Sequence, residues 1–239
     1  AALLVLLSGI AWTVFGTEAG TRWLVAQLER QFEGRLRVES AEGSLLAGLR
    51  VGRLVWSGEP LPLDARGVSI RLDWARLARF ELSVPGLQLD SIELAPRPSS
   101  DPARQPESLR LPFAWRLDRF RAGELVIKLP DGQQRLGPIE LSAAYSGGTY
   151  KLSSLQAEAF GVRITRGEAA LADSAPFGLR AEAEVVSEAT RWLRLAGLSE
   201  APRAGAVVPP EPLLIRAVAS GSLAELVASV SSGLRGAEF

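Results

Sequence analysis

The residues that could do chemistry in this chain are carboxylates, because the sequence contains no histidine and no cysteine. Without them the chain lacks the commonest general base, thiol nucleophiles, disulfides and the usual metal ligands. Asp73 and Glu81 could form an acid–base pair of the kind that glycosidases use. Each stands between apolar neighbours, however, and such alternation favours the solvated face of a strand. We therefore expect no enzymatic activity, no metal site and no cofactor.

The charge balance also gives no sign of a charged partner. Lysine plus arginine and aspartate plus glutamate each number 27, so no net field steers the chain toward nucleic acid. The basic residues are scattered, without the clustered basic patch that nucleic-acid binding requires. No phosphate-binding loop, dinucleotide fingerprint or nucleophile elbow is present.

An alternating stretch, residues 65–94, dominates the middle of the chain. Val68, Ile70 and Leu72 alternate there with the polar Ser69 and Arg71. A period of two residues is typical of a strand with one face away from water. Comparable strands recur about every ten residues, with turn signals between them, which predicts a mainly β fold.

Irregularities in this pattern predict local features. The apolar phase slips at Gly52-Arg53 and again within residues 136–145, which indicates a bulge or bend. Pro112 falls inside an expected strand that runs from residue 109 to 117, so that strand is either an edge or bent. The Pro-rich residues 95–107 are typical of an exposed loop. The pattern breaks over residues 187–212, and strands are expected again at 213–219 and 226–230.

The first sixteen residues carry no charge, and as a helix they would span roughly 24 Å. We expect residues 1–16 to be an uncleaved transmembrane signal anchor, because no small-residue cleavage site precedes Glu18. A cleavable signal peptide and a buried helix are the alternatives. The anchor residues are Leu3, Leu4, Val5, Leu6, Leu7, Ile10, Trp12, Val14 and Phe15.

Residues 17–34 predict a short amphipathic helix. Thr17 can cap its start, Leu24, Leu28 and Phe32 share one face, and Gly34 can end it. The apolar face of this helix either lies at a membrane interface or covers the end of the β region, and the pattern favours the second interpretation.

The order of these features resembles the N-terminal part of TamB-like proteins of the AsmA superfamily. The resemblance is carried by GTEAGTRWLVAQL after the apolar run, LRVESAEGSLLAGLRVGRLVW, VSIRLDWARLARFELSVPGLQLDSIEL, LPFAWRLDRF, and YKLSSLQAEAFGVRITRGEAALADSAPFGLRAEAEV. The resemblance covers nearly the whole chain. The resemblance thus predicts the N-terminal fragment of a longer protein.

The resemblance implies a single-pass inner-membrane protein whose residues 35–239 form a periplasmic β-sheet. That sheet is expected to be long and curved, an open apolar groove of the β-taco type that carries phospholipids toward the outer membrane. The family also acts in outer-membrane assembly with a barrel partner of the TamA type, which would engage a region C-terminal to this fragment. The residues expected to line the groove are Leu36, Val38, Leu49, Val51, Val68, Ile70, Leu72, Phe80, Leu82, Leu109, Leu111, Phe113, Leu125, Ile127, Leu141, Tyr150, Leu152, Ile164, Phe177 and Leu179.

The residues alone leave the occupant of the apolar face open. About ten strands would carry more apolar area than a monomer normally exposes, so this face must meet a second sheet, close into a barrel or contact lipid. A periplasmic β-sandwich that serves as a binding or structural module is the main alternative. A carbohydrate-active enzyme is a more distant one.

Overall fold

The computed structural model describes residues 15–77, 79–97, 108–159, 162–188, 212–222 and 225–232. Within these ranges the chain forms two helices and one sheet of 13 strands. The helices are α2 (Glu18–Gln31) and α3 (Trp74–Leu77). The strands are β1 (Leu36–Ser44), β2 (Gly48–Trp56), β3 (Leu63–Arg71), β4 (Glu81–Val84), β5 (Gly86–Leu94), β6 (Ala114–Leu129), β7 (Gly132–Leu136), β8 (Ile139–Ser146), β9 (Thr149–Ala159), β10 (Val162–Ala172), β11 (Gly178–Glu188), β12 (Pro212–Ser222) and β13 (Leu226–Ser232).

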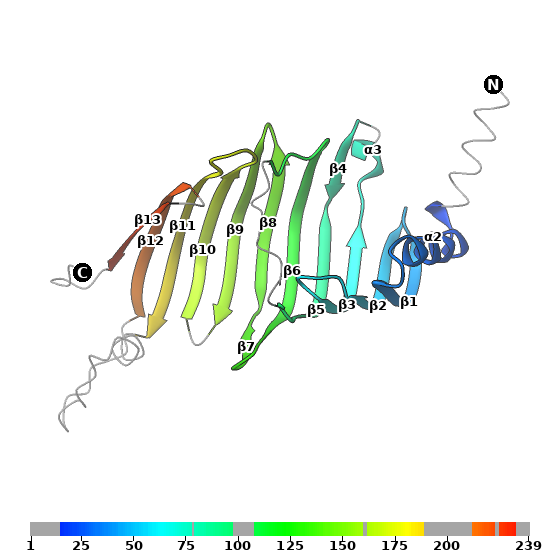
Figure 1. Ribbon diagram of the computed structural model, residues 1–239, viewed down its shortest axis with the longest axis horizontal. Coiled ribbons are helices and arrows are strands. Elements are labelled where there is room, and N and C mark those ends of the chain that lie inside the picture. The colour runs from blue at the N-terminus through cyan, green and yellow to red at the C-terminus, as the bar shows by residue number, and fades with distance from the viewer. Residues whose placement is uncertain are drawn as a thin grey trace.

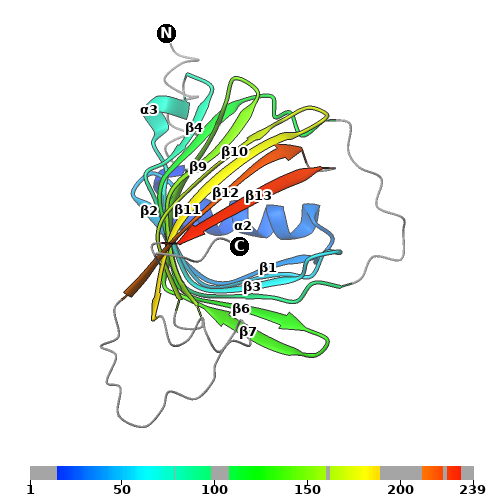
Figure 2. The same ribbon diagram turned by 90° about the vertical axis from the view of Figure 1, so that its left-hand side faces the viewer.

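The sheet is a single layer that is bent into a trough. Its strands follow the order β1-β2-β3-β5-β6-β8-β9-β10-β11-β12-β13, while β4 and β7 both pair with β6. Figure 1 shows the strands side by side along the trough, and Figure 2 looks along its length and shows each strand as an arc. Among the described residues β1 and β13 do not pair, and no second sheet covers the first. The mainly β expectation is confirmed, and the closed sandwich is not the architecture found.

Neighbouring strands are antiparallel except where β6 runs parallel to β4 and to β5, and the second of these pairs explains the Pro-rich stretch. β5 and β6 run parallel, from Leu87 beside Phe120 to Leu94 beside Ile127. A parallel pair cannot be joined by a hairpin, so the chain must return from the end of β5 to the start of β6 at the opposite rim of the trough. The Pro-rich residues 95–107 belong to this connection. The parallel pairing therefore explains why a long segment, and not a short hairpin turn, joins β5 to β6.

A row of residues without ladder partners crosses the first strands and bends them. Ser40, Gly52, Gly67, Asp90 and Gly123 stand opposite one another by register, and we call this row the crease. Ser40 and Gly67 have φ values of +58° and +62°. The register is the same on both sides of the crease. The slip predicted at Gly52-Arg53 is therefore a bend without the extra residue that defines a bulge.

The crease explains how both halves of a strand contribute to one face. Normal alternation would place Val51 and Leu54 of β2 on opposite faces of the sheet. Both instead contact one apolar cluster, in which Val51 is 5% exposed and Leu54 packs against its edge. The crease resets the alternation, so the apolar residues before and after it point to the same side.

Helix α2 covers one end of the trough. Its first turn is capped as predicted, because the Thr17 hydroxyl accepts a hydrogen bond from the backbone N–H of Gly20. Glu29 accepts a 2.7 Å hydrogen bond from the backbone N–H of Val38 in the edge strand β1. Figure 2 shows the helix crossing the open side of the curve. The end-cover interpretation of residues 17–34 is thus the one that the structure supports.

Two strand boundaries differ from the predictions. Phe80 does not begin a strand, because β4 starts at Glu81 and Phe80 lies in the turn after α3. The strand expected from residue 109 begins only at Ala114, and Leu109 and Leu111 instead bond to residues at the ends of other strands. Pro112 marks this change, since it has no backbone N–H for a ladder. The resumed strands at 213–219 and 226–230 are confirmed as parts of β12 and β13.

The expected transmembrane anchor falls almost wholly outside the described residues. Of its nine named residues only Phe15 is described. No helix within the described ranges is long and apolar enough to cross a bilayer.

Candidate functional site

The candidate site is the face of the sheet on which apolar residues meet apolar residues across almost every strand pair. Directly paired residues share a face, so the register identifies its members. Leu49 pairs with Ile70, and Ile70 pairs with Leu87. The same match continues to the far end of the sheet, where Val185 pairs with Ile215. We call this continuous surface the apolar face.

The apolar face is most closely packed beside the crease. Val51, Ala65, Val68 and Leu89 form its core, with Ala65 only 2% exposed. Leu63, Leu87, Ile92 and others that surround this core are only partly buried. Bending brings neighbouring side chains over one another, but no second layer of the described chain lies above them. Most of the face therefore remains open to a ligand.

The apolar face lies on the concave side of the trough. Phe32, just after α2, meets Trp56 of β2 edge-on, with ring centroids 5.5 Å apart. Because α2 lies on the open side of the curve (Figure 2), Trp56 must point to that side. Trp56 pairs with Leu36 and Leu63, which places these apolar residues on the concave side as well.

Fifteen of the twenty residues predicted to line the groove lie in the strands or at a strand end. They are Leu36, Val38, Leu49, Val51, Val68, Ile70, Leu72, Leu82, Leu125, Ile127, Leu141, Tyr150, Leu152, Ile164 and Leu179. Sequence reasoning left out Ala65, Leu89 and Ala122, which are among the most buried residues of the chain. Leu89 and Ala122 continue the alternation of Leu87 and Phe120, so the pattern could have found them, whereas Ala65 shares a face with Val68 only because the crease lies between them.

The other five predicted lining residues lie outside the strands. Phe80 is 87% exposed in its turn, and Phe113 is 43% exposed just before β6. Leu109 and Leu111 belong to the rim segment that precedes β6, and Phe177 is buried in the turn between β10 and β11. For these residues the predicted strand positions are wrong, because alternation in the sequence continues where the ladder does not.

The convex side carries the polar residues, many of them in ion pairs across strands. Arg53 and Asp64 form the best-defined pair, with guanidinium–carboxylate distances of 2.7 to 3.2 Å. The hydrogen bond from Arg53 is the main cause that lowers the pKa of Asp64 below its ordinary value. Farther along the sheet Arg216 of β12 pairs with Glu182 of β11, and Arg166 pairs with Glu168 within β10. The two sides of the trough therefore differ sharply in polarity.

A buried polar cluster fixes the rim segment to the ends of β8, β9 and β10. The Tyr145 hydroxyl donates a 2.7 Å hydrogen bond to the Asp173 carboxylate, which is 2% exposed as a residue. The same hydroxyl accepts a bond from the N–H of Leu111, and the N–H of Leu109 donates to the Asp173 carbonyl. The Tyr150 hydroxyl donates to the Leu109 carbonyl. This cluster holds the second end of the crossover connection in place.

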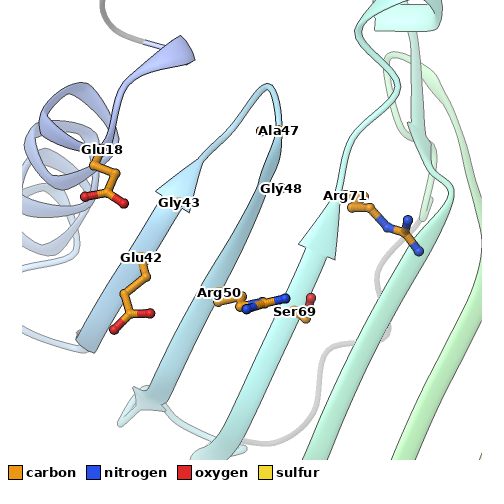
Figure 3. Close-up of a pocket in the computed structure, with 8 residues that line it drawn as sticks. All are labelled: Glu18, Glu42, Gly43, Ala47, Gly48, Arg50, Ser69 and Arg71. Atoms are coloured by element: carbon orange, nitrogen blue, oxygen red, sulfur yellow. The ribbon is translucent and has the colours of Figure 1, made fainter.

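A polar cleft of about 660 Å³ lies between α2 and strands β1, β2 and β3. Figure 3 shows Glu18 and Glu42 on the side of α2 and β1, with Arg50 and Arg71 on the side of β2 and β3. Arg50 and Arg71 make no ion pair within the described ranges. The mixed charges indicate a solvated cleft without preference for one sign of ligand.

The carboxylates considered as an acid–base pair have a structural partner in common. Arg76 contacts Asp73 at 3.5 Å and Glu81 at 3.2 Å. Asp73 also accepts hydrogen bonds from the N–H groups of Ala75 and Arg76 and so begins α3. The pair thus fastens both ends of the α3 turn. In the part of the chain that the structure describes, no group of three or more acidic side chains is arranged to hold a metal ion.

A single-layer sheet, open along its length, apolar inside and ion-paired outside, defines the class of groove-shaped β proteins. Comparison with known families matches TamB, N-terminal domain, over residues 6–188, and the chain belongs to this family. Membership gives the chain a TamB-type role in outer-membrane assembly, in a family of membrane-associated proteins that work with an outer-membrane partner. No curated protein and no solved structure matches the chain.

Proposed function

We propose that the concave apolar face binds the acyl chains of phospholipids and conducts them between the inner and outer membranes. The single observation that carries this proposal is an apolar surface that runs from β1 to β13 without a second layer above it in the described residues. Such a surface would be unstable in water, and acyl chains would cover it.

The headgroups would remain at the open side of the trough, where water can solvate them. A groove that is open along its length suits a lipid that moves, because the headgroup never has to cross an apolar barrier. The chain would act without chemical catalysis, anchored in the inner membrane with the sheet in the periplasm. Its partner in the outer membrane would be a barrel of the TamA type.

Ile70 and Arg71 provide a matched test, because they are adjacent in β3 and point to opposite sides of the sheet. A photo-crosslinking side chain at position 70 of the full chain in cells should capture phospholipid, and the same group at position 71 should not. Mass spectrometry of the adducts identifies the lipid. Equal capture at both positions would contradict the groove.

The Ile70→Arg variant tests transport. A charge on the apolar face must lose water when acyl chains surround it, which costs several kcal/mol. We expect a folded variant with less bound phospholipid, whereas Arg71→Glu should change neither the Tm nor the lipid content. A folded Ile70→Arg protein that binds lipid as the wild type does would rule the proposal out.

A further inference from the structure

The exposed aromatic ring of Phe80 is not explained by the apolar face. Phe80 is 87% exposed and has a φ of +61°. A bulky residue rarely adopts this left-handed conformation, because it costs conformational energy that a glycine would avoid. Leu77, at the end of α3, is 39% exposed. Together with Arg79 these residues form a surface that we call the α3 tip.

The α3 tip is held in place by its own hydrogen bonds. Asp73 caps the helix, and Arg76 joins Asp73 to Glu81 on the far side of the turn. The N–H of Phe80 donates to the carbonyl of Leu77, which closes the turn. The outward position of Phe80 is therefore set by a defined turn structure.

The α3 tip lies beside the point at which the uncharged N-terminal run meets the sheet. The ring of Phe15 packs against Trp74 of α3, with centroids 5.2 Å apart, and the Phe15 carbonyl accepts a hydrogen bond from the N–H of Leu46. The indole N–H of Trp74 donates to the carbonyl of Leu45. These contacts fasten the end of residues 1–16, the predicted anchor, directly to α3.

The α3 tip lies close enough to the predicted anchor to reach the bilayer that residues 1–16 would cross. A helix of four residues is about 6 Å long, so Leu77 and its neighbours lie close to Trp74 and Phe15. The headgroup layer on each side of a bilayer is about 5–8 Å thick. If residues 1–16 cross the membrane, the α3 tip starts at the headgroup layer.

Charge favours a bilayer with anionic lipids. Arg76 and Arg116 both contact Glu81, and Arg76 also contacts Asp73, so these charges are largely balanced. Arg79 makes no ion pair with any described residue. We propose that the α3 tip inserts Phe80 and Leu77 into the headgroup region of the anchoring membrane while Arg79 binds anionic headgroups, which fixes the mouth of the trough against the bilayer.

Because the chain contains no cysteine, a spin label can be placed at one chosen position. The full chain with Phe80→Cys is labelled with a nitroxide and reconstituted into vesicles of phosphatidylethanolamine and phosphatidylglycerol. Leu129→Cys is the matched control, since Leu129 is an exposed apolar residue at the β6–β7 hairpin, far from α3 (Figure 1). Collision with oxygen, relative to collision with a water-soluble nickel complex, measures immersion in lipid.

We expect the oxygen-to-nickel ratio at position 80 to be severalfold higher than at position 129. Equal ratios would overturn the insertion of the α3 tip. Adding Arg79→Glu to the labelled Phe80→Cys protein should lower the ratio toward the control, as should high salt, which screens the headgroup charges. An unchanged ratio in that variant would overturn the role assigned to Arg79. The measurement is independent of lipid in the trough, so either proposal can fail alone.

Discussion

At the scale of single residues, the contact between Tyr145 and Asp173 helps to hold the segment that precedes β6 at the rim of the trough. Asp173 accepts the Tyr145 hydroxyl, and its own backbone carbonyl accepts the N–H of Leu109 and the hydroxyl of Ser108. Removing the Tyr145 hydroxyl from the buried Asp173 carboxylate would therefore be costly. The bonds from Tyr145, Leu109 and Ser108 to Asp173 therefore hold the rim segment together as one cluster.

The ionisation of Tyr145 tests this contact. The hydrogen bond to Asp173, followed by burial, raises the pKa of Tyr145 above its ordinary value of 10.0. A raised pKa means that the contact stabilises the fold fully below the unfolded-state pKa, and that this stability is lost as the pH rises through the folded-state pKa. The contribution of this contact to stability is therefore lost only at strongly alkaline pH.

The chain has two tyrosines, so a Tyr150→Phe background leaves Tyr145 as the only one. Absorbance at the wavelength of tyrosinate should then show a midpoint above 10.0. Adding Asp173→Asn should lower that midpoint, because the negative partner is gone. A midpoint at or below the ordinary value in the Tyr150→Phe protein would contradict the buried bond.

At the scale of the elements, the crease determines the shape of the first strands. A Cβ atom at Gly67 would stand 1.9 Å from a carboxylate oxygen of Asp90, and one at Gly123 would stand 2.6 Å from the Asp90 carbonyl. The Asp90 side chain thus fills the space beside Gly67, and the backbone of β5 fills the space beside Gly123, so neither position has room for a Cβ atom. The glycines thus permit the bend that turns both halves of each strand toward the concave side.

Substitution of Gly67 should expose this requirement. Gly67→Ala adds a left-handed alanine, which costs about 1–2 kcal/mol, and a clash with Asp90, which costs about 1–3 kcal/mol more. Gly34→Ala is the control, because Gly34 also has a positive φ of +76° but a Cβ added there would meet no atom within 4 Å. Denaturant unfolding should show the larger loss for Gly67→Ala.

A second variant separates the two costs. Adding Asp90→Ala to Gly67→Ala removes the carboxylate that meets the new methyl group, so part of the lost stability should return. If Gly67→Ala and Gly34→Ala lower the free energy of unfolding equally, the contact with Asp90 at the crease does not contribute to stability.

At the scale of the whole molecule, the two ends of the sheet differ. Helix α2 covers β1, and Glu29 occupies a backbone donor of its edge. Within the described residues nothing pairs with the outer edge of β13, where Val227 and Val230 are 68% and 65% exposed. A free, apolar edge strand is a template for pairing with another strand.

Residues 1–239 should therefore self-associate through β13. Val227→Lys places a charge on that edge and should lower the associated fraction in analytical ultracentrifugation, measured in detergent. Arg22→Lys on α2 is a control that preserves charge at the covered end. Equal association of the two variants would show that the β13 edge is not the contact.

The sequence by itself determined the class of the fold and which residues are apolar in the strands. Alternation at Val68, Ile70 and Leu72 depends only on the two-residue period of an extended chain, so it could be recognised without a structure. The capped helix after Thr17 and the hairpin at residues 130–131 follow from equally local rules.

Only the tertiary structure decided how the strands bend, which apolar residues lie outside the ladder, and whether the sheet is open or closed. Alternation cannot tell a bend from a bulge, because that depends on whether Gly52 and Gly67 stand opposite each other on separate strands. Nor can it show that Phe80 and Leu109 lie outside the ladder, since ladder bonds join residues distant in the sequence. An open trough and a closed sandwich share the same local period, and only long-range pairing of the strands distinguishes them.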